Sequence, residues 1–155
     1  MEVVEQAAVI GAPIELVREA MNDLESIPRW ATVEGTVDNP QGQGIGRSYA
    51  WYFRVSGFHF KGKLEVIDQS ESRLVTKSTG DIDSIWTIEL TPLSRHSTAI
   101  RVVVEYVPPH KLLEPLADLV VRQLASPEVA TENMNRFKLM IEQQPLTSEL
   151  SRDRG

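Results

Sequence analysis

The chain has 155 residues, of which 41% are hydrophobic and 25% are charged, and its formal net charge is -6. This length and composition are typical of one soluble globular domain, and they exclude a disordered chain, a collagen and a coiled coil. Because the sequence has no cysteine, disulfides, thiolate nucleophiles and thiolate zinc or iron–sulfur sites are excluded. The negative charge argues against nucleic-acid binding through clustered Lys and Arg.

The amino-terminal residues carry acids where a signal peptide needs basic residues. No apolar run approaches the roughly 20 residues that a membrane-spanning helix needs. We therefore expect a soluble, cytoplasmic protein.

A strand is predicted over residues 3–10, which are rich in β-branched and apolar side chains and end at a Gly-Ala-Pro sequence. Apolar residues then recur every three or four positions from Ile14 to Leu24, which predicts a helix with one apolar face. A second, very short helix is expected over residues 27–30.

Between residues 33 and 107 the hydrophobic pattern predicts a series of consecutive strands. The turn clusters that separate these strands lie at residues 38–42, 55–57, 69–72, 79–81 and 92–96. Short turns join neighbouring antiparallel strands, whereas parallel strands need longer and usually helical connections. The region therefore predicts an antiparallel meander and not a doubly wound α/β sheet.

The final periodic segment covers about residues 111–142 and carries an apolar stripe on one helical face. An unbroken helix of this span is roughly 48 Å long, whereas a domain of this size has a radius of gyration of about 15 Å. We expect a bend at Ser126-Pro127, because proline removes a backbone donor and serine caps a restarted helix. The polar residues 146–155 are expected to form a disordered tail, which leaves 1–145 as the single domain.

A seven-stranded antiparallel sheet of this kind curls, and the long helix buries its stripe on the concave side, which leaves room for a pocket. Strand residues two apart share a face, so alternation predicts which side chains point inward. The predicted ligand-binding residues are Trp30, Tyr49, Trp51, Phe53, Phe58, Phe60, Leu64, Trp86, Ile88, Tyr106, Leu116 and Val120. The alternative for each aromatic residue is a place in an ordinary core.

A few polar side chains are expected to orient a ligand in such a pocket. The candidates are Tyr49, Tyr52, Arg54, Arg101 and Tyr106. The alternative for each is a surface or structural role.

Three other patterns favour a structural role over a catalytic or ligand-binding one. The glycine run at 42–46 lacks the spacing of a phosphate-binding loop and precedes a strand, so a flexible loop at the mouth of the pocket is the better interpretation. Asp81 and Asp83 fit a paired acid and base, but such residues at the start of a strand are typical turn formers. The three histidines are not spaced for metal ligation, and we expect no metal or cofactor.

The order of elements and several local patterns resemble the START-like (SRPBCC) superfamily, and within it the polyketide cyclase/dehydrase and lipid-transport group. The resemblance covers roughly residues 2–143. It rests on the helix APIELVREAMNDLESIPRW, the turn GQGIG before RSYAWYF, the strand KGKLEVID followed by SRLVTKSTG, Trp86, RVVVEYVPP and the amphipathic KLLEPLADLVVRQL. It implies an α+β helix-grip fold, in which a curved seven-stranded antiparallel sheet wraps around a long C-terminal helix, with two short helices between the first and second strands.

The resemblance also implies a deep pocket for a hydrophobic ligand such as a lipid, a polyketide or an aromatic compound. The first expected function is therefore the binding of such a molecule between sheet and helix. The alternative is a polyketide cyclase/dehydrase-type enzyme that acts by orienting its substrate in the same cavity. A third possibility is an interaction module that forms a homodimer through the outer face of the sheet.

Overall fold

The computed structural model describes residues 2–107, 112 and 114–154, and the side chains of these residues except 114, 125 and 144–154. In this part of the chain, seven strands form one antiparallel sheet in the order β1-β7-β6-β5-β4-β3-β2. The strands are β1 (Glu2–Ile10), β2 (Glu34–Gln41), β3 (Ser48–Val55), β4 (Phe58–Gln69), β5 (Arg73–Gly80), β6 (Asp83–Ser94) and β7 (Ser97–Val107). The helical segments are α1 (Ile14–Asn22), the 3-10 turn η1 (Leu24–Ser26), α2 (Ile27–Trp30), α3 (Glu114–Ala125) and α4 (Pro127–Arg154).

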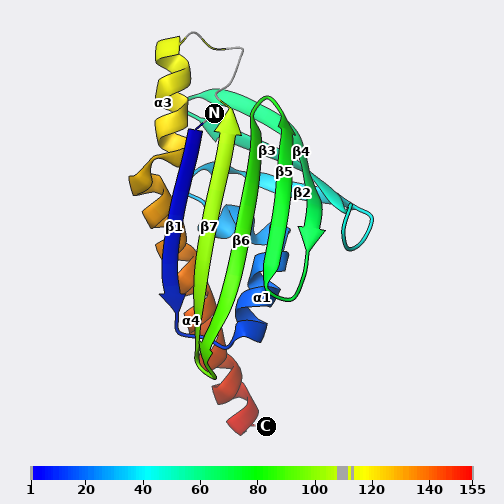
Figure 1. Ribbon diagram of the computed structural model, residues 1–155, viewed down its shortest axis with the longest axis vertical. Helices are drawn as coiled ribbons and strands as arrows, with labels where there is room; N and C mark the ends of the chain where they lie inside the picture. Colours follow the sequence, from blue (N-terminus) through cyan, green and yellow to red (C-terminus); the bar gives the residue numbers. More distant parts are fainter. Residues whose placement is uncertain (1, 108–111, 113, 155) are drawn as a thin grey trace.

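The sheet is strongly curved, and α1 and α4 lie on its concave side (Figure 1). The first strand, β1, pairs with the last, β7, and α4 packs along β1. The predicted α+β fold is confirmed: a meander of antiparallel strands, short helices between β1 and β2, and a C-terminal helix that the sheet surrounds.

The predicted bend of the C-terminal helix is confirmed, because α3 ends at Ala125 and α4 begins at Pro127. The Ser126 hydroxyl accepts a hydrogen bond from the Val129 backbone N–H at 3.2 Å. This bond satisfies one of the amide donors that a helix start leaves free. The break lets α3 and α4 follow the curved sheet as two separate segments.

The turns predicted at residues 55–57 and 69–72 are confirmed, but the turns at 38–42, 79–81 and 92–96 start later than predicted. β2 continues to Gln41 and β6 to Ser94, each through an irregular register. Pro40 lies in the irregular stretch of β2 between Asp38 and Gln41, as is usual for a proline in a strand. Pro92 keeps its place in β6 opposite Thr98, and the irregularity follows it, between Pro92 and Ser94.

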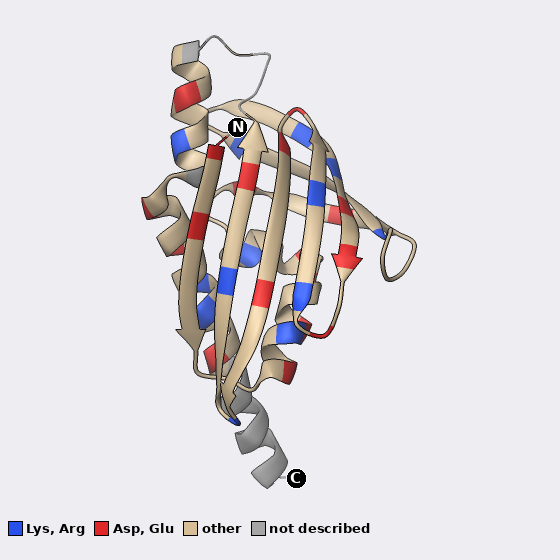
Figure 2. Ribbon diagram, in the orientation of Figure 1, with Lys and Arg blue, Asp and Glu red and all other residues tan. Residues whose placement is uncertain are grey.

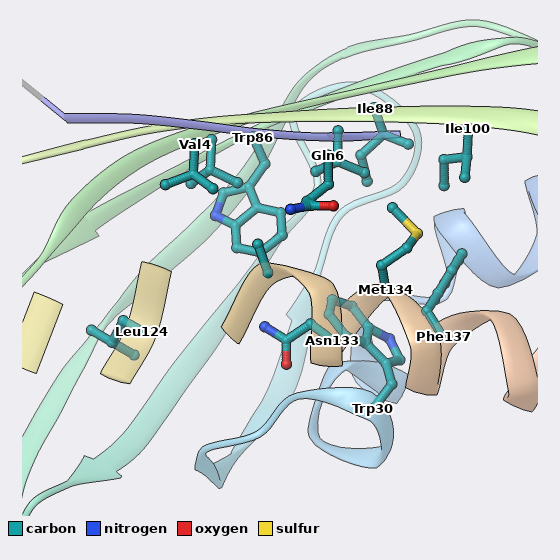
Figure 3. A pocket seen from close by; sticks show the side chains of 13 residues that line it. Val4, Gln6, Trp30, Trp86, Ile88, Ile100, Leu124, Asn133, Met134 and Phe137 are labelled. Atoms are coloured by element: carbon teal, nitrogen blue, oxygen red, sulfur yellow. The ribbon is translucent and has the colours of Figure 1, made fainter. Parts of the chain in front are cut away.

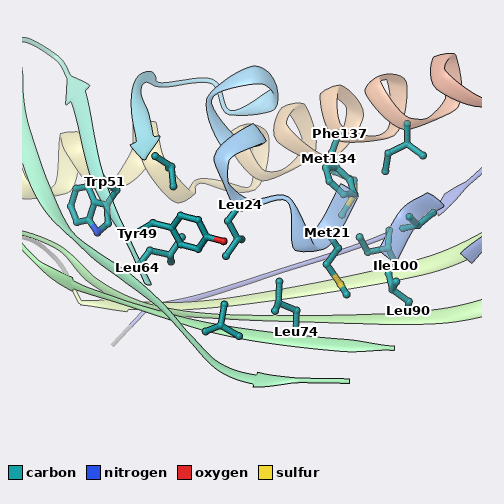
Figure 4. Packing of buried hydrophobic residues seen from close by; sticks show 14 of the residues in the cluster. Met21, Leu24, Tyr49, Trp51, Leu64, Leu74, Leu90, Ile100, Met134 and Phe137 are labelled. Atoms are coloured by element: carbon teal, nitrogen blue, oxygen red, sulfur yellow. The ribbon is translucent and has the colours of Figure 1, made fainter. Parts of the chain in front are cut away.

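The core lies between the concave face and the helices, and Figure 4 shows how its side chains interdigitate. Inward residues predicted by alternation are buried on two neighbouring strands: Trp51 on β3, and Phe60 and Leu64 on β4. The alternation rule therefore holds on these two strands.

On the outer face of the sheet, Lys and Arg positions are interspersed with Asp and Glu positions (Figure 2). Arg101 lies 2.6 Å from Glu5 and 3.6 Å from Glu89, which are its neighbours on the strands at either side. About half of each of these side chains is exposed. This face is a solvated surface and not a continuous basic stripe.

Among the described residues, no helix combines the length and the apolarity needed to cross a membrane. The backbone of α4 continues to Arg154, but the side chains of residues 144–154 lie outside the described part. The disordered tail expected at 146–155 stays a prediction.

Candidate ligand-binding cavity

Three cavities of about 70, 120 and 140 Å³ lie between the sheet and the helices. We call them the first, second and third cavities. Trp86 on β6 and Leu124 at the end of α3 border all three. The three cavities therefore meet at the Trp86 indole, which divides the internal space of the domain.

Aromatic rings from three different elements make the wall of the first cavity (Figure 3). Trp30 of α2 meets Trp86 edge-on, with ring centroids 6.5 Å apart and planes inclined by 61°. Trp30 also meets Phe137 of α4, at 5.5 Å and 76°. Edge-to-face pairs of this kind are favourable, because the positive ring edge meets the negative ring face. The wall is thus fixed by contacts between α2, β6 and α4.

Two amide side chains lie among these rings, Gln6 from β1 and Asn133 from α4 (Figure 3). Asn133 Oδ1 accepts a hydrogen bond from the Thr32 N–H at 2.9 Å, and Gln6 Nε2 donates to Thr131 Oγ1 at 3.3 Å. The amides therefore attach α4 to the α2–β2 connection and to the edge of the sheet. They also give an otherwise apolar cavity a small number of polar atoms.

The second cavity is polar along one wall, where Ser78, Ser84 and Tyr106 face it. Burial raises the pKa of the Tyr106 phenol, and the negative charge of Glu2 raises this pKa further. Tyr106 therefore stays protonated at neutral pH and is available as a hydrogen-bond donor.

Of the predicted ligand-binding residues, eight line at least one cavity. These are Trp30, Trp51, Phe53, Phe60, Leu64, Trp86, Ile88 and Tyr106. Their role in ligand binding stays a prediction, but the structure places them around three cavities that share Trp86 and Leu124.

The other four predicted residues do not line the three cavities. Tyr49 is buried, and its hydroxyl accepts a hydrogen bond from Arg47 Nε at 3.1 Å. Val120 is fully buried and Phe58 packs against the core. Leu116 is 39% exposed, because α3 turns the neighbouring Ala117 inward instead.

Three of the polar candidates have a surface or structural role and do not line the cavities. Tyr52 contacts His59, and Arg54 forms an ion pair with Glu34, both at exposed positions. Arg101 belongs to the charged outer face described above. Residues at even positions of β3 point away from the face that holds Tyr49, Trp51 and Phe53, so alternation already excludes Tyr52 and Arg54 from the cavity.

The two aspartates form turns, as the simpler interpretation expects. Asp81 Oδ2 accepts from the Lys61 N–H at 2.9 Å, and Asp83 Oδ1 accepts from the Gly80 N–H at 3.2 Å. Among the described residues, no group of three His, Asp or Glu side chains is placed to hold a metal ion. His110 lies outside the described residues.

The glycine loop does not lie at the mouth of the three cavities, so that expectation was wrong. Gly44 and Ile45 border a separate surface depression of about 340 Å³, together with Arg18. Arg47 holds the loop there, because its guanidinium donates to Gly44 O at 3.0 Å and to Asn22 O at 3.3 Å. The loop is thereby attached to the end of α1 and not to the cavity.

The profile of the protein family described as "Polyketide cyclase / dehydrase and lipid transport" matches residues 1–142. The chain belongs to this family. A comparison with curated proteins found no match. The START-like helix-grip fold expected from the sequence is confirmed by this match and by the solved structures.

Several solved structures share the fold of this family member. A protein of Thermus thermophilus is 19% identical, with a TM-score of 0.73, covering 90% of this chain and 97% of that one. The Zhui aromatase/cyclase of Streptomyces sp. R1128 is 14% identical, with a TM-score of 0.64 and coverages of 92% and 94%. A START superfamily protein of Mycobacterium smegmatis is 14% identical, with a TM-score of 0.63 and coverages of 92% and 95%. At these identities the likeness is one of fold.

Proposed function

We propose that this family member binds a small hydrophobic molecule in the three cavities that meet at Trp86. The observation that carries the proposal is the shared border of the cavities, since one indole and Leu124 reach all of them. Sites for small apolar ligands are concave, mostly lined by apolar side chains and supplied with a few polar groups. The space around Trp86 has these properties.

The energetics support an apolar ligand. Removing about 200 Å² of apolar ligand surface from water stabilises a complex by roughly 5 kcal/mol, before the entropic cost of association. Because the walls come from separate elements, a rotation of Trp86 or a small movement of α3 joins neighbouring cavities into one longer space. The bound molecule then spans the cavities end to end.

The proposal is tested by incubating the purified protein with a total lipid extract, followed by native mass spectrometry and identification of the ligand that is released. We expect a discrete mass addition from one class of apolar molecule. A protein that carries nothing from any extract, with an unchanged melting temperature, would contradict the proposal.

A cyclase/dehydrase-type enzyme is the second candidate, and the polar atoms of Asn133 and Tyr106 in the cavities favour it. In such an enzyme the cavity holds a flexible chain in a reactive shape, so that catalysis is mainly orientation. Incubation with a linear β-polyketone and mass analysis of the recovered compound separates the two functions. Recovery of the unchanged compound supports binding alone. Recovery of a cyclised compound that has lost one or more water molecules supports an enzyme. The cytoplasmic location and the homodimer stay predictions.

A further inference from the structure

Three hydroxyl-bearing residues form a row across the sheet at the second cavity. Ser78 of β5 lies opposite Ser84 of β6, and Ser84 lies opposite Tyr106 of β7. Residues directly opposite each other on one face have Cβ atoms about 4.5–5.5 Å apart. All three side chains line the same cavity, so they share one face of the sheet.

These hydroxyls, like the buried Trp51 Nε1 that borders the same cavity, have no hydrogen-bond partner among the described residues. In the part of the chain that the structure describes, none of the three is hydrogen-bonded to another protein group, whereas the Tyr49 hydroxyl and the Asn133 amide both have partners. The hydroxyl oxygens are not among the buried atoms without a partner, which in the described part of the chain are Asn22 Oδ1 and Trp51 Nε1, so they are accessible from the cavity. A ligand oxygen at this wall supplies the missing partner.

The charges around these three hydroxyls restrict the chemical class of the ligand oxygen that they can bind. The other nine described residues that line the second cavity are apolar, so none of these residues brings a positive charge to it. Tyr106 has a negative charge beside it, because Glu2 lies opposite Tyr106 on β1. A carboxylate placed here loses its hydration and gains no positive partner, which disfavours an anionic ligand.

We propose that Ser78, Ser84 and Tyr106 bind a neutral oxygen of the ligand, either a hydroxyl or a ketone. The apolar body of the same molecule then extends past Trp86 toward Trp30 and Phe137. This inference rests on the proposed function and names its ligand class: an uncharged phenol, alcohol or ketone, in preference to a hydrocarbon or a carboxylate.

Isothermal titration with three probes of one ring system tests the inference: 2-naphthol, naphthalene and 2-naphthoate at neutral pH. We expect 2-naphthol to bind about tenfold more tightly than either of the others, which is the effect of one or two hydrogen bonds. Tyr106→Phe and Ser84→Ala should each lower the affinity for 2-naphthol about fivefold and leave that for naphthalene unchanged. Tyr52→Phe, at an exposed position on the outer face, is the matched control and should change neither affinity.

The possible failures are distinguishable. Equal affinities for 2-naphthol and naphthalene, with no effect of Tyr106→Phe, overturn the role of the three hydroxyls in ligand binding. This result leaves the proposed function unaffected. Preference for 2-naphthoate overturns the neutral-ligand assignment alone. Absence of binding for all three probes overturns the inference and contradicts the proposed function as well. Because Ser84→Ala is a small change, it provides the test if Tyr106→Phe does not fold.

Discussion

The indole of Trp51 lies directly on Gly62, its cross-strand partner on β4, so that a Cβ at position 62 would be 2.5 Å from Trp51 Cζ2. The neighbouring ring of Phe53 stacks on Trp51, with centroids 5.7 Å apart. The glycine therefore makes room for an aromatic wall that borders the second and third cavities.

Gly62→Ala is expected to destabilise the protein by about 2 kcal/mol or more, because the added methyl group would lie 2.1 Å from the Thr79 backbone oxygen as well as against the Trp51 ring. Urea unfolding measures the free energy. Lys63→Ala, at the adjacent and exposed position of β4, is the control and should change stability by less than about 0.5 kcal/mol. Equal stability of the two variants would show that the β5 backbone at Thr79 and the Trp51 ring both make room without cost.

Asn133→Ala is expected to cost about 1–2 kcal/mol, because it leaves the Thr32 N–H without its acceptor. Asn135→Ala removes the same side chain from the exposed face of α4 and serves as the control. Thermal unfolding followed by circular dichroism compares the two variants. A melting temperature that falls equally in both would assign the effect to the helix and not to the hydrogen bond.

Ser126→Ala should destabilise the start of α4 by about 1 kcal/mol, through loss of the bond to the Val129 N–H. Ser126→Thr keeps the hydroxyl and should recover most of this free energy. Hydrogen exchange at the first amides of α4 reports the change locally. Unchanged exchange in Ser126→Ala would mean that Pro127 alone starts the helix.

Deprotonation of Tyr106 is expected to lower the free energy of unfolding in alkaline solution. Its pKa is raised in the folded protein by burial and by Glu2, so the native state favours the protonated phenol. The contribution is complete below the ordinary pKa of 10.0 and is lost as the pH rises through the higher, folded value. Urea unfolding between pH 8 and pH 11 should therefore show a smaller decline for Tyr106→Phe than for the unchanged protein. An identical decline would contradict the prediction, with Tyr52→Phe as control.

Much of the fold follows from local pattern. Alternation placed Trp51, Phe53 and Trp86 on the inner face, because a strand has a fixed period of two whatever it packs against. Ser126-Pro127 marked the helix break through backbone chemistry alone. Ser84 shows a signal that was present but overlooked, since it lies between the inward positions Ile82 and Trp86.

Other features depend on how distant segments meet. Asn133 and Gln6 reach the first cavity because of the position of α4 against β1, which no local pattern specifies. Leu116 belongs to the predicted apolar stripe but is exposed, because α3 buries Ala117 and Val120 instead. The glycine loop was misplaced for a similar reason: Arg47 attaches it to α1 through tertiary hydrogen bonds.

The measurement that tests the account most directly is ligand binding to a pair of variants on β7. Val104 borders the first and second cavities, whereas its neighbour Val103 has the opposite orientation, toward the outer face. Titration with 2-naphthol, followed by calorimetry, should show binding to Val103→Phe equal to that of the unchanged protein and a loss of at least about tenfold for Val104→Phe, because the added ring fills the cavity. Equal affinity of both folded variants would place the ligand elsewhere and contradict the account.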